Sequence, residues 1–267
     1  MRNGFPGPTA CLLVLIFCLL PPGKPGAEEA DVPAISIIID DIGYRHTDDI
    51  NALTLPGPVT YAILPHSPNA KKMSQLASTA GKDIILHIPM EAVENEKNGL
   101  MGPGGLTQEM DKLQFITSLS KSFRSVPNII GVNNHMGSLL TTDGERMDWL
   151  MEYLRMKQVF YIDSLTSNQS VASLAAGRKA IPYLKRDVFL DNSIRKEDIV
   201  DQFNELIRIA KRRGFAIAIG HPHPETIEIL ADNLNRLDEF GVRMISLQDL
   251  VNQQLPRNYD YKKISQR

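Results

Sequence analysis

The sequence predicts an α/β protein whose parallel strands form a closed, or nearly closed, barrel. Short apolar runs rich in β-branched residues alternate with longer amphipathic segments about seven times, the order that gives parallel strands joined by helical crossovers. No internal repeat and no low-complexity linker divides the 267 residues, which indicates a single domain. An open, doubly wound sheet is the alternative architecture.

The strands are predicted from runs that are apolar at nearly every position. Such runs are typical of strands that are covered on both faces. The first of them, "ISIIID", leads directly into a second aspartate. In chain order, the predicted strands are residues 35–40, 59–64, 83–88, 129–133, 159–163, 188–191, 215–220 and, with the weakest pattern, 243–246.

Amphipathic helices are predicted between these runs. Gly81, Gly214 and Gly241 follow three of them, at the position where a left-handed residue ends a helix. The segment 91–106 has no period and carries four glycines in its second half. It is predicted to be a long loop, either a binding loop or a surface insertion. The predicted helices are residues 69–80, 107–125, 145–158, 196–213 and 225–240.

Residues 1–27 are predicted to be a secretory signal peptide, cleaved near Ala27. Arg2 precedes the apolar run "ACLLVLIFCLL", and the breaker-rich "PPGKPGA" follows it. This run is too short to span a bilayer comfortably and has the order of a signal sequence. The domain would then comprise residues 28–267, in an exported and periplasmic protein. A retained N-terminal anchor is the alternative.

Composition excludes several kinds of chemistry. Both cysteines, Cys11 and Cys18, lie in the predicted signal peptide, so a mature chain would have neither a disulfide nor a cysteine-ligated zinc ion. Basic residues number 29 against 31 acidic ones, without a long basic run, which argues against a nucleic-acid partner. Aromatic residues make up only 6% of the chain, with a single tryptophan, which favours a small or short substrate.

Ionisable and amide side chains follow nearly every predicted strand. Because the carboxyl ends of parallel strands meet at one mouth, these side chains are expected to converge. Imidazole and carboxylate groups that converge are what a divalent metal ion requires. Asp41, His87 and His135 form the natural set of three ligands. Such a set leaves coordination positions open for water and for a substrate oxygen.

The adjacent carboxylates Asp40 and Asp41 are costly to bury together unless a cation lies beside them. With a cation present, one acid can bind the ion while the other takes a proton from water. Strand alternation would aim the two side chains to opposite sides, but Gly43 indicates a chain that is already turning, so both could reach the cavity. The residues alone leave open which acid has which role.

Other residues at the strand ends are candidates for orienting ligands or substrate. Asn134, Asp163 and Asp191 belong to this group, although each aspartate could instead cap the next helix. His221 and His223 follow the strand 215–220, and a proline after each histidine stiffens their loop. The two histidines could alternatively be ordinary loop or capping residues.

Five motifs in this order resemble the divergent polysaccharide deacetylase family, a branch of the NodB-like carbohydrate esterases. The motifs are "IIIDDIG", "LHIPME", "NNHMGS", "YIDS" and "IGHPHP", and the resemblance extends from Ala34 to about Leu250. It implies a distorted (β/α)7 barrel in one domain, with a divalent metal, usually zinc, at the carboxyl-end mouth. It also implies that Asp40 is the catalytic base, Asp41 a metal ligand and His221 the general acid.

The chain departs from the wider superfamily in two motifs. The second superfamily motif has two metal histidines four residues apart, whereas here only His87 is present and His135 on the next strand must replace the other. The third motif, which carries an arginine, is replaced by "NNHMGS". The three ligands are therefore inferred from their positions.

The resemblance implies a metal-dependent deacetylase of N-acetylated or O-acetylated sugars in a cell-envelope glycan or an exopolysaccharide. The alternative is an envelope protein that binds glycans or acts as a scaffold and has kept the barrel and the metal site without turnover. Either function implies a glycan partner, and envelope-protein partners are compatible with both. The sequence does not fix the oligomeric state.

Overall fold

The structure is a computed structural model, and it describes residues 1, 4, 32–94 and 98–255. The predicted signal peptide, residues 1–27, lies outside the described residues apart from Met1 and Gly4. The chain divides into two units, Met1–Asp31 and Val32–Arg267, and every helix and strand named below belongs to the second. No helix in the described ranges is long and apolar enough to cross a membrane.

Strands and helices alternate along the second unit, as predicted. In chain order the elements are β1 (Ala34–Ile42), α1 (His46–Leu53), β2 (Thr60–Ile63), α2 (Ala70–Thr79), β3 (Ile84–Met90), α4 (Lys112–Ser125), β4 (Gly131–Met136), the 3-10 helix η1 (Leu140–Thr142), α5 (Gly144–Lys157), β5 (Phe160–Asp163), α6 (Ala172–Lys179), β6 (Tyr183–Lys185), β7 (Val188–Phe189), α7 (Lys196–Arg213), β8 (Phe215–Gly220), α8 (Pro224–Leu234), β9 (Arg243–Met244) and α9 (Leu247–Gln254).

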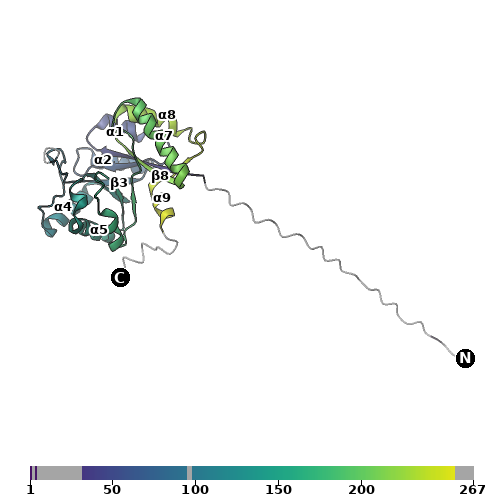
Figure 1. Ribbon diagram of the computed structural model, residues 1–267, viewed down its shortest axis with the longest axis horizontal. Coiled ribbons are helices and arrows are strands. Elements are labelled where there is room, and N and C mark those ends of the chain that lie inside the picture. Colours follow the sequence, from purple (N-terminus) through teal and green to yellow (C-terminus); the bar gives the residue numbers. More distant parts are fainter. Residues whose placement is uncertain (2–3, 5–31, 95–97, 256–267) are drawn as a thin grey trace. The chain divides into compact units, whose positions relative to one another are not determined.

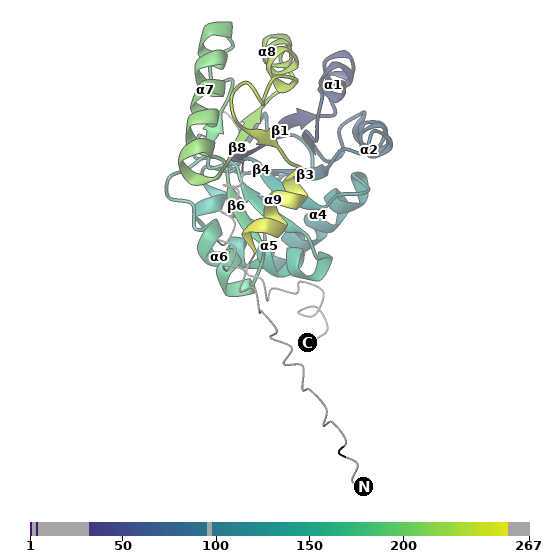
Figure 2. The ribbon, with the colours of Figure 1, turned by 90° about the vertical axis from the view of Figure 1, so that its right-hand side faces the viewer.

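The strands form one parallel sheet that curls into a half-barrel. Its order is β6-β5-β4-β3-β2-β1-β8-β7, and β9 pairs with β1 beside this path. Helices surround the curled sheet on its outside, as Figures 1 and 2 show. The predicted α/β fold with a distorted barrel is confirmed, and the alternative of an open, doubly wound sheet is not supported.

The two faces of the sheet bury two different apolar clusters. Alternate strand residues such as Ile37 and Tyr61 belong to the larger cluster, beneath the outer helices. The intervening residues, such as Ile38 and Ile85, belong to a smaller cluster on the inner face. Leu250 of α9 joins this inner cluster, and Figure 2 shows α9 in the centre of the ring of helices. The inner face is therefore closed by α9 at one end.

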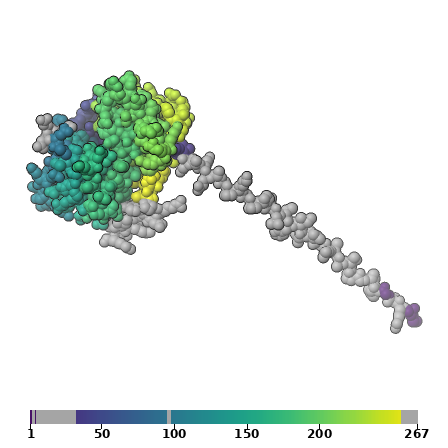
Figure 3. Space-filling model, viewed as in Figure 1, coloured from purple at the N-terminus to yellow at the C-terminus, as the bar shows by residue number. Residues whose placement is uncertain are grey.

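Helix α9 closes the amino end of the strands. The Ser36 hydroxyl, near the start of β1, donates to the carbonyl of Ile245, and the Asp83 carboxylate, just before β3, accepts from the amide of Gln248 in α9. The opposite, carboxyl end of the inner face is free of this helix. The space-filling view shows the outer surface, on which α7 (green) lies next to segments from the middle of the chain (teal) (Figure 3).

Several elements differ from their predicted bounds. Helix α4 begins at Lys112 rather than at residue 107, because Asp111 and Gln114 form a reciprocal capping box. The predicted helix 225–240 ends at Leu234. Three eight-residue helices, α1, α6 and α9, were not predicted, since so few turns give little periodicity.

Candidate metal and catalytic centre

The ends of β1, β3 and β4 bring the predicted ligands together. His87 pairs in register with Asn133, and Pro89 with His135, so both histidines lie on the inner face of the sheet. Asp40 follows Ile38 by two residues and shares the same face. Four polar side chains thus continue the inner apolar column toward the carboxyl end of the strands.

Asp41 reaches this group through an irregular backbone. Strand alternation would turn its side chain to the outer face, but β1 shifts register between Ile39 and Ile42 and Asp41 has a φ of 60°. The left-handed conformation is rare for a residue other than glycine and costs about 1–3 kcal/mol, so it is often found at functional sites. The expected turn is present, and it begins at Asp41 itself rather than only at Gly43.

Three candidate ligand atoms form a nearly regular triangle. Asp41 Oδ1 lies 2.9 Å from His135 Nδ1 and 3.2 Å from His87 Nε2. The two imidazole nitrogens lie 3.2 Å from each other. These three residues form one of the groups whose ligand atoms all lie within 4.8 Å, so the close spacing on which the predicted site depends is present.

The triangle has the dimensions of a divalent metal site. An ion about 2.1 Å from each ligand, at angles of roughly 90–110°, holds adjacent ligand atoms about 3.0–3.4 Å apart. Asp41 Oδ1 is buried and makes no well-aligned hydrogen bond despite the two nearby nitrogens. A cation would satisfy this oxygen, so the residues present fit a metal ion.

Asn133 orients the imidazole of His87 toward the triangle. The Nδ1 atom of His87 lies 2.7 Å from Asn133 Oδ1, which can only accept a hydrogen bond, so the proton is on Nδ1 and the Nε2 lone pair faces the triangle. The amide nitrogen of Asn133 donates to Asp40 Oδ1 at 2.8 Å. One buried amide therefore fixes both a candidate ligand and the candidate base.

Asp40 lies beside the triangle in a nearly closed environment. Its side chain is 3% exposed, and its Oδ2 lies 3.6 Å from His87 Nε2. Burial raises the pKa of Asp40 above its ordinary value, against the opposing effects of His87, His221 and the Asn133 hydrogen bond. For Asp41, burial acts in the same direction, but the close imidazoles of His135 and His87 hold its pKa far below the usual range. The adjacent acids thus have opposite protonation tendencies.

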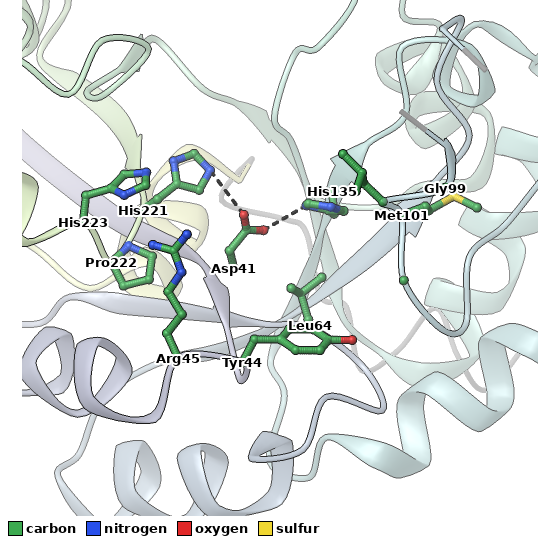
Figure 4. Close-up of a pocket in the computed structure, with 12 residues that line it drawn as sticks. Asp41, Tyr44, Arg45, Leu64, Gly99, Met101, His135, His221, Pro222 and His223 are labelled. Atoms are coloured by element: carbon green, nitrogen blue, oxygen red, sulfur yellow. Dashed lines mark ion pairs between the residues drawn. The ribbon is translucent and has the colours of Figure 1, made fainter. Parts of the chain in front are cut away.

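His221 is held on the other side of Asp41 by a buried carboxylate. Asp191 accepts hydrogen bonds from the Nδ1 and backbone nitrogen of His221, at 2.9 and 2.7 Å, and from the Thr226 hydroxyl. Burial lowers the pKa of His221, but the Asp191 contacts outweigh it and raise the pKa to about 9. The Nε2 atom of His221 lies 3.9 Å from Asp41 Oδ2, as the dashed line in Figure 4 indicates.

A pocket of about 440 Å³ opens onto Asp41, His135 and His221. The long loop between β3 and α4, predicted as a binding loop or an insertion, forms part of its wall. The lining residues are Asp41, Tyr44, Arg45, Leu64, Gly99, Leu100, Met101, Gly102, His135, His221, Pro222 and His223 (Figure 4). Its size is within the usual range for small-ligand sites.

Two predicted residues lie elsewhere. The side-chain oxygen Oδ1 of Asn134 accepts from the Tyr161 hydroxyl and the Ser164 amide, on the outer face of the sheet. Asp163 is also on that face, where its carboxylate accepts from Ser170 and from the Leu165 amide. Both join the ends of β4 and β5 to the following loops rather than orienting the ligand triangle. Asn133, rather than its neighbour Asn134, contacts His87 and Asp40.

The remaining predicted residues lie at the pocket. Asp191 orients His221, as expected of a supporting residue, and His223 lines the pocket at the N-terminus of α8 without capping that helix through its side chain. Sequence reasoning missed Asn133, Tyr44 and Arg45. Counting back two residues from His135 along one strand would have found Asn133, because residues two apart share a face.

Comparisons with known proteins identify the family of this chain. A family model described as divergent polysaccharide deacetylase matches residues 37–251. An uncharacterized protein of Haemophilus influenzae is 37% identical over 216 residues, covering 81% of this chain and 76% of that protein. This relationship is well above the level at which only the fold is shared.

Solved structures share the fold at lower identity. An uncharacterized protein from Agrobacterium tumefaciens C58 has a TM-score of 0.79 and 23% identity, covering 84% of this chain and 91% of that one. A mutant of a carbohydrate esterase family 4 (CE4) pseudoenzyme from Bacillus anthracis, with restored enzymatic activity, has a TM-score of 0.51 and 12% identity, covering 83% and 68%. The fold is therefore NodB-like. With the family model spanning almost the whole described domain, the chain belongs to the divergent polysaccharide deacetylase family.

Proposed function

We propose that this protein is a metal-dependent deacetylase that acts, after export to the periplasm, on N-acetylated or O-acetylated sugars of a cell-envelope glycan or an exopolysaccharide. The observation that carries the proposal is the triangle of Asp41 Oδ1, His87 Nε2 and His135 Nδ1, which opens onto a pocket and has Asp40 and His221 beside it. Zinc is the ion that a carboxylate and two imidazoles suit best.

The two groups beside the triangle divide the proton transfers. A divalent cation held there would polarise the acetyl carbonyl and lower the pKa of water toward 7. Asp40, whose raised pKa suits a base, takes a proton as the water oxygen bonds to the acetyl carbon. The bond from that carbon to the sugar nitrogen or oxygen then breaks, and the departing atom receives a proton from His221. The products are acetate and a free amine or hydroxyl.

His221 has the properties of the acid in this scheme. In the metal-free protein its pKa is about 9, so the imidazole is protonated at neutral pH. Asp191 holds its Nδ1–H, so the opposite nitrogen, Nε2, faces Asp41 and the pocket. With a cation held by Asp41, His87 and His135, the nearby imidazolium of His221 would add to the stabilisation of negative charge that develops on the carbonyl oxygen.

A glycan-binding protein without turnover is the second candidate, and one observation favours it. Asp40 is nearly inaccessible and does not line the pocket, so its carboxylate is poorly exposed for a base. The wild-type form of the CE4 neighbour is described as a pseudoenzyme, and at 10% identity its likeness to this chain concerns the fold.

Acetate release decides between these two functions. The mature protein, loaded with Zn²⁺ and checked by elemental analysis, is incubated with N-acetylated chitooligosaccharides, with peptidoglycan and with an O-acetylated glycan. We expect acetate from at least one of them and at least a hundredfold loss in Asp40→Asn, since general acid–base catalysis contributes about 10²–10⁴-fold. Asp201→Asn, which changes an exposed carboxylate of α7, serves as the matched control.

Three outcomes have different meanings. Acetate release that persists in Asp40→Asn would contradict the role of the base. Binding of these glycans without release by metal-loaded protein would favour the binding protein. A chain that cannot be loaded with a divalent metal would contradict the proposal as a whole.

A further inference from the structure

The two walls of the pocket differ in chemistry. Arg45 and His223 lie on one side of Asp41, together with His221 (Figure 4). On the other side, Met101 and its neighbours in the loop contribute apolar and backbone surface. A ligand that fills the pocket therefore contacts donor groups along one wall and carbon along the other.

Arg45 is attached to a well-defined backbone. It stands at the N-terminus of α1, where its carbonyl accepts a hydrogen bond of 2.7 Å from the amide of Asp49. Asp49 is buried, and its Oδ2 accepts from the amide of Gly43, in the turn that follows Asp41. The position of Arg45 is therefore tied to the same turn that brings Asp41 into the pocket.

The guanidinium group of Arg45 has no acidic partner among the described residues, within the 4 Å that defines an ion pair. Most other arginines in this part of the chain do have one, for example Arg178 with Asp148 and Arg213 with Asp187. Asp41 is the single carboxylate among the lining residues, and it faces the imidazoles of His87 and His135. The donors of Arg45 are thus directed toward a pocket that contains no free acid to neutralise them.

We propose that Arg45 makes its wall of the pocket an anion subsite, and that the substrate is an acetylated sugar bearing a carboxylate or phosphate group. A guanidinium presents its N–H donors in a planar fork that matches either group. The proposal rests on the proposed deacetylase function for the acetyl group and adds the charged substituent. A neutral acetylated sugar would leave these donors without a partner in the complex.

The opposite wall suits the sugar ring. Leu64, Met101 and the Tyr44 ring, which is 48% exposed, offer apolar surface to the C–H face of a pyranose. Together with the limited volume, this surface fits one or two sugar units. Neutral and charged sugars would make the same ring contacts. Arg45 would therefore distinguish them by the charge of the substituent.

Three probes that differ mainly in charge test the subsite directly. They are N-acetylglucosamine, N-acetylmuramic acid, which adds a carboxylate, and N-acetylglucosamine 6-phosphate. Binding to the Zn²⁺-loaded protein is measured by calorimetry or ligand-observed NMR at low salt. We expect at least one anionic sugar to bind roughly tenfold or more tightly than the neutral one, as charge-assisted hydrogen bonds at a partly exposed site allow.

Substitutions of Arg45 test whether a preference for anionic sugars depends on its guanidinium group. Arg45→Gln should reduce the affinity for the anionic sugar to that for N-acetylglucosamine, while Arg45→Lys should keep part of the preference. Arg212→Gln removes an exposed cation in the last turn of α7, outside the pocket, and should leave the preference unchanged. Preference for the carboxylate probe alone or for the phosphate probe alone identifies which anion the subsite accepts.

The subsite and the deacetylase function can fail separately. Equal affinity for neutral and anionic sugars, a preference that survives Arg45→Gln, or no binding of either anionic sugar at millimolar concentration would overturn the subsite. Equal rates of acetate release from neutral and anionic substrates would also overturn it, while leaving the deacetylase intact. Anion-dependent binding without acetate release would overturn the deacetylase and leave the subsite.

Discussion

The amino and carboxyl ends of the inner sheet face are built from the same strands but have opposite chemistry. At the amino end, apolar residues such as Ile38 and Ile85 pack with Leu250 of α9. Two residues further along the same strands, Asp40 and His87 replace them. The apolar end stabilises the fold by burial, whereas the polar end places charged groups where they are costly to bury.

The cost at the polar end is reduced by mutual contacts. Asn133 contacts both His87 and Asp40, and Asp191 contacts His221, so nearly every buried polar group has a partner. Asp41 Oδ1 is an exception among the described residues, since it lacks a well-aligned hydrogen bond. Substitutions at the polar end should therefore weaken metal binding, whereas substitutions at the apolar end should lower the free energy of unfolding.

The largest effect is expected from removing a ligand at the polar end. His135→Ala should abolish stoichiometric Zn²⁺ binding and acetate release, because two remaining ligands hold the ion only weakly. Elemental analysis and calorimetric titration of the purified protein measure this loss. His46→Ala, which changes a histidine near Lys72 outside the triangle, should bind as much metal as the unmodified protein. Full metal retention by His135→Ala would contradict the three-ligand assignment.

At the apolar end, Leu250→Ala should destabilise the fold by about 3 kcal/mol, the typical cost of truncating a buried leucine. Urea unfolding of the metal-free protein measures this change, with Gln253→Ala on the exposed side of α9 as the control. Metal stoichiometry under native conditions should be unchanged. If Leu250→Ala lost the metal while remaining folded, the two ends would be coupled rather than separate.

Much of this division could be predicted from the sequence, because it follows from strand ends. Apolar strands that carry Asp40, His87 and His135 near their carboxyl ends place these residues at one mouth whichever helices surround them. Gly43 predicted a turn, but that the irregular backbone begins at Asp41 could not be predicted, since it depends on a local shift in strand pairing. Arg45 was missed together with the short helix α1 that it precedes.

The His221–Asp191 pair should make the stability of the metal-free protein depend on pH. The pKa of His221 is raised from about 6.5 to about 9, so its contribution is fully present below pH 6.5 and is lost as the pH rises through 9. A shift of this size corresponds to about 3 kcal/mol at most. Unfolding free energies of the protein and of His221→Gln, measured from pH 6 to 10, should converge as the pH rises. A difference that stays constant would contradict the charged pair.

The smallest effect on metal binding is expected from substituting Asn133, which lies within β4 and supports the polar end of the inner face. Asn133→Ala removes the acceptor for His87 Nδ1–H and the donor to Asp40, but leaves the three ligand atoms in place. Zn²⁺ affinity should fall about 10–100-fold, the usual effect of losing a group that orients a metal ligand. Asn134→Ala is the matched control, because its side chain bonds to Tyr161 and Ser164 on the outer face and should affect stability more than affinity. Equal losses of Zn²⁺ affinity in the two variants would contradict a specific role for the inward-facing side chain of Asn133.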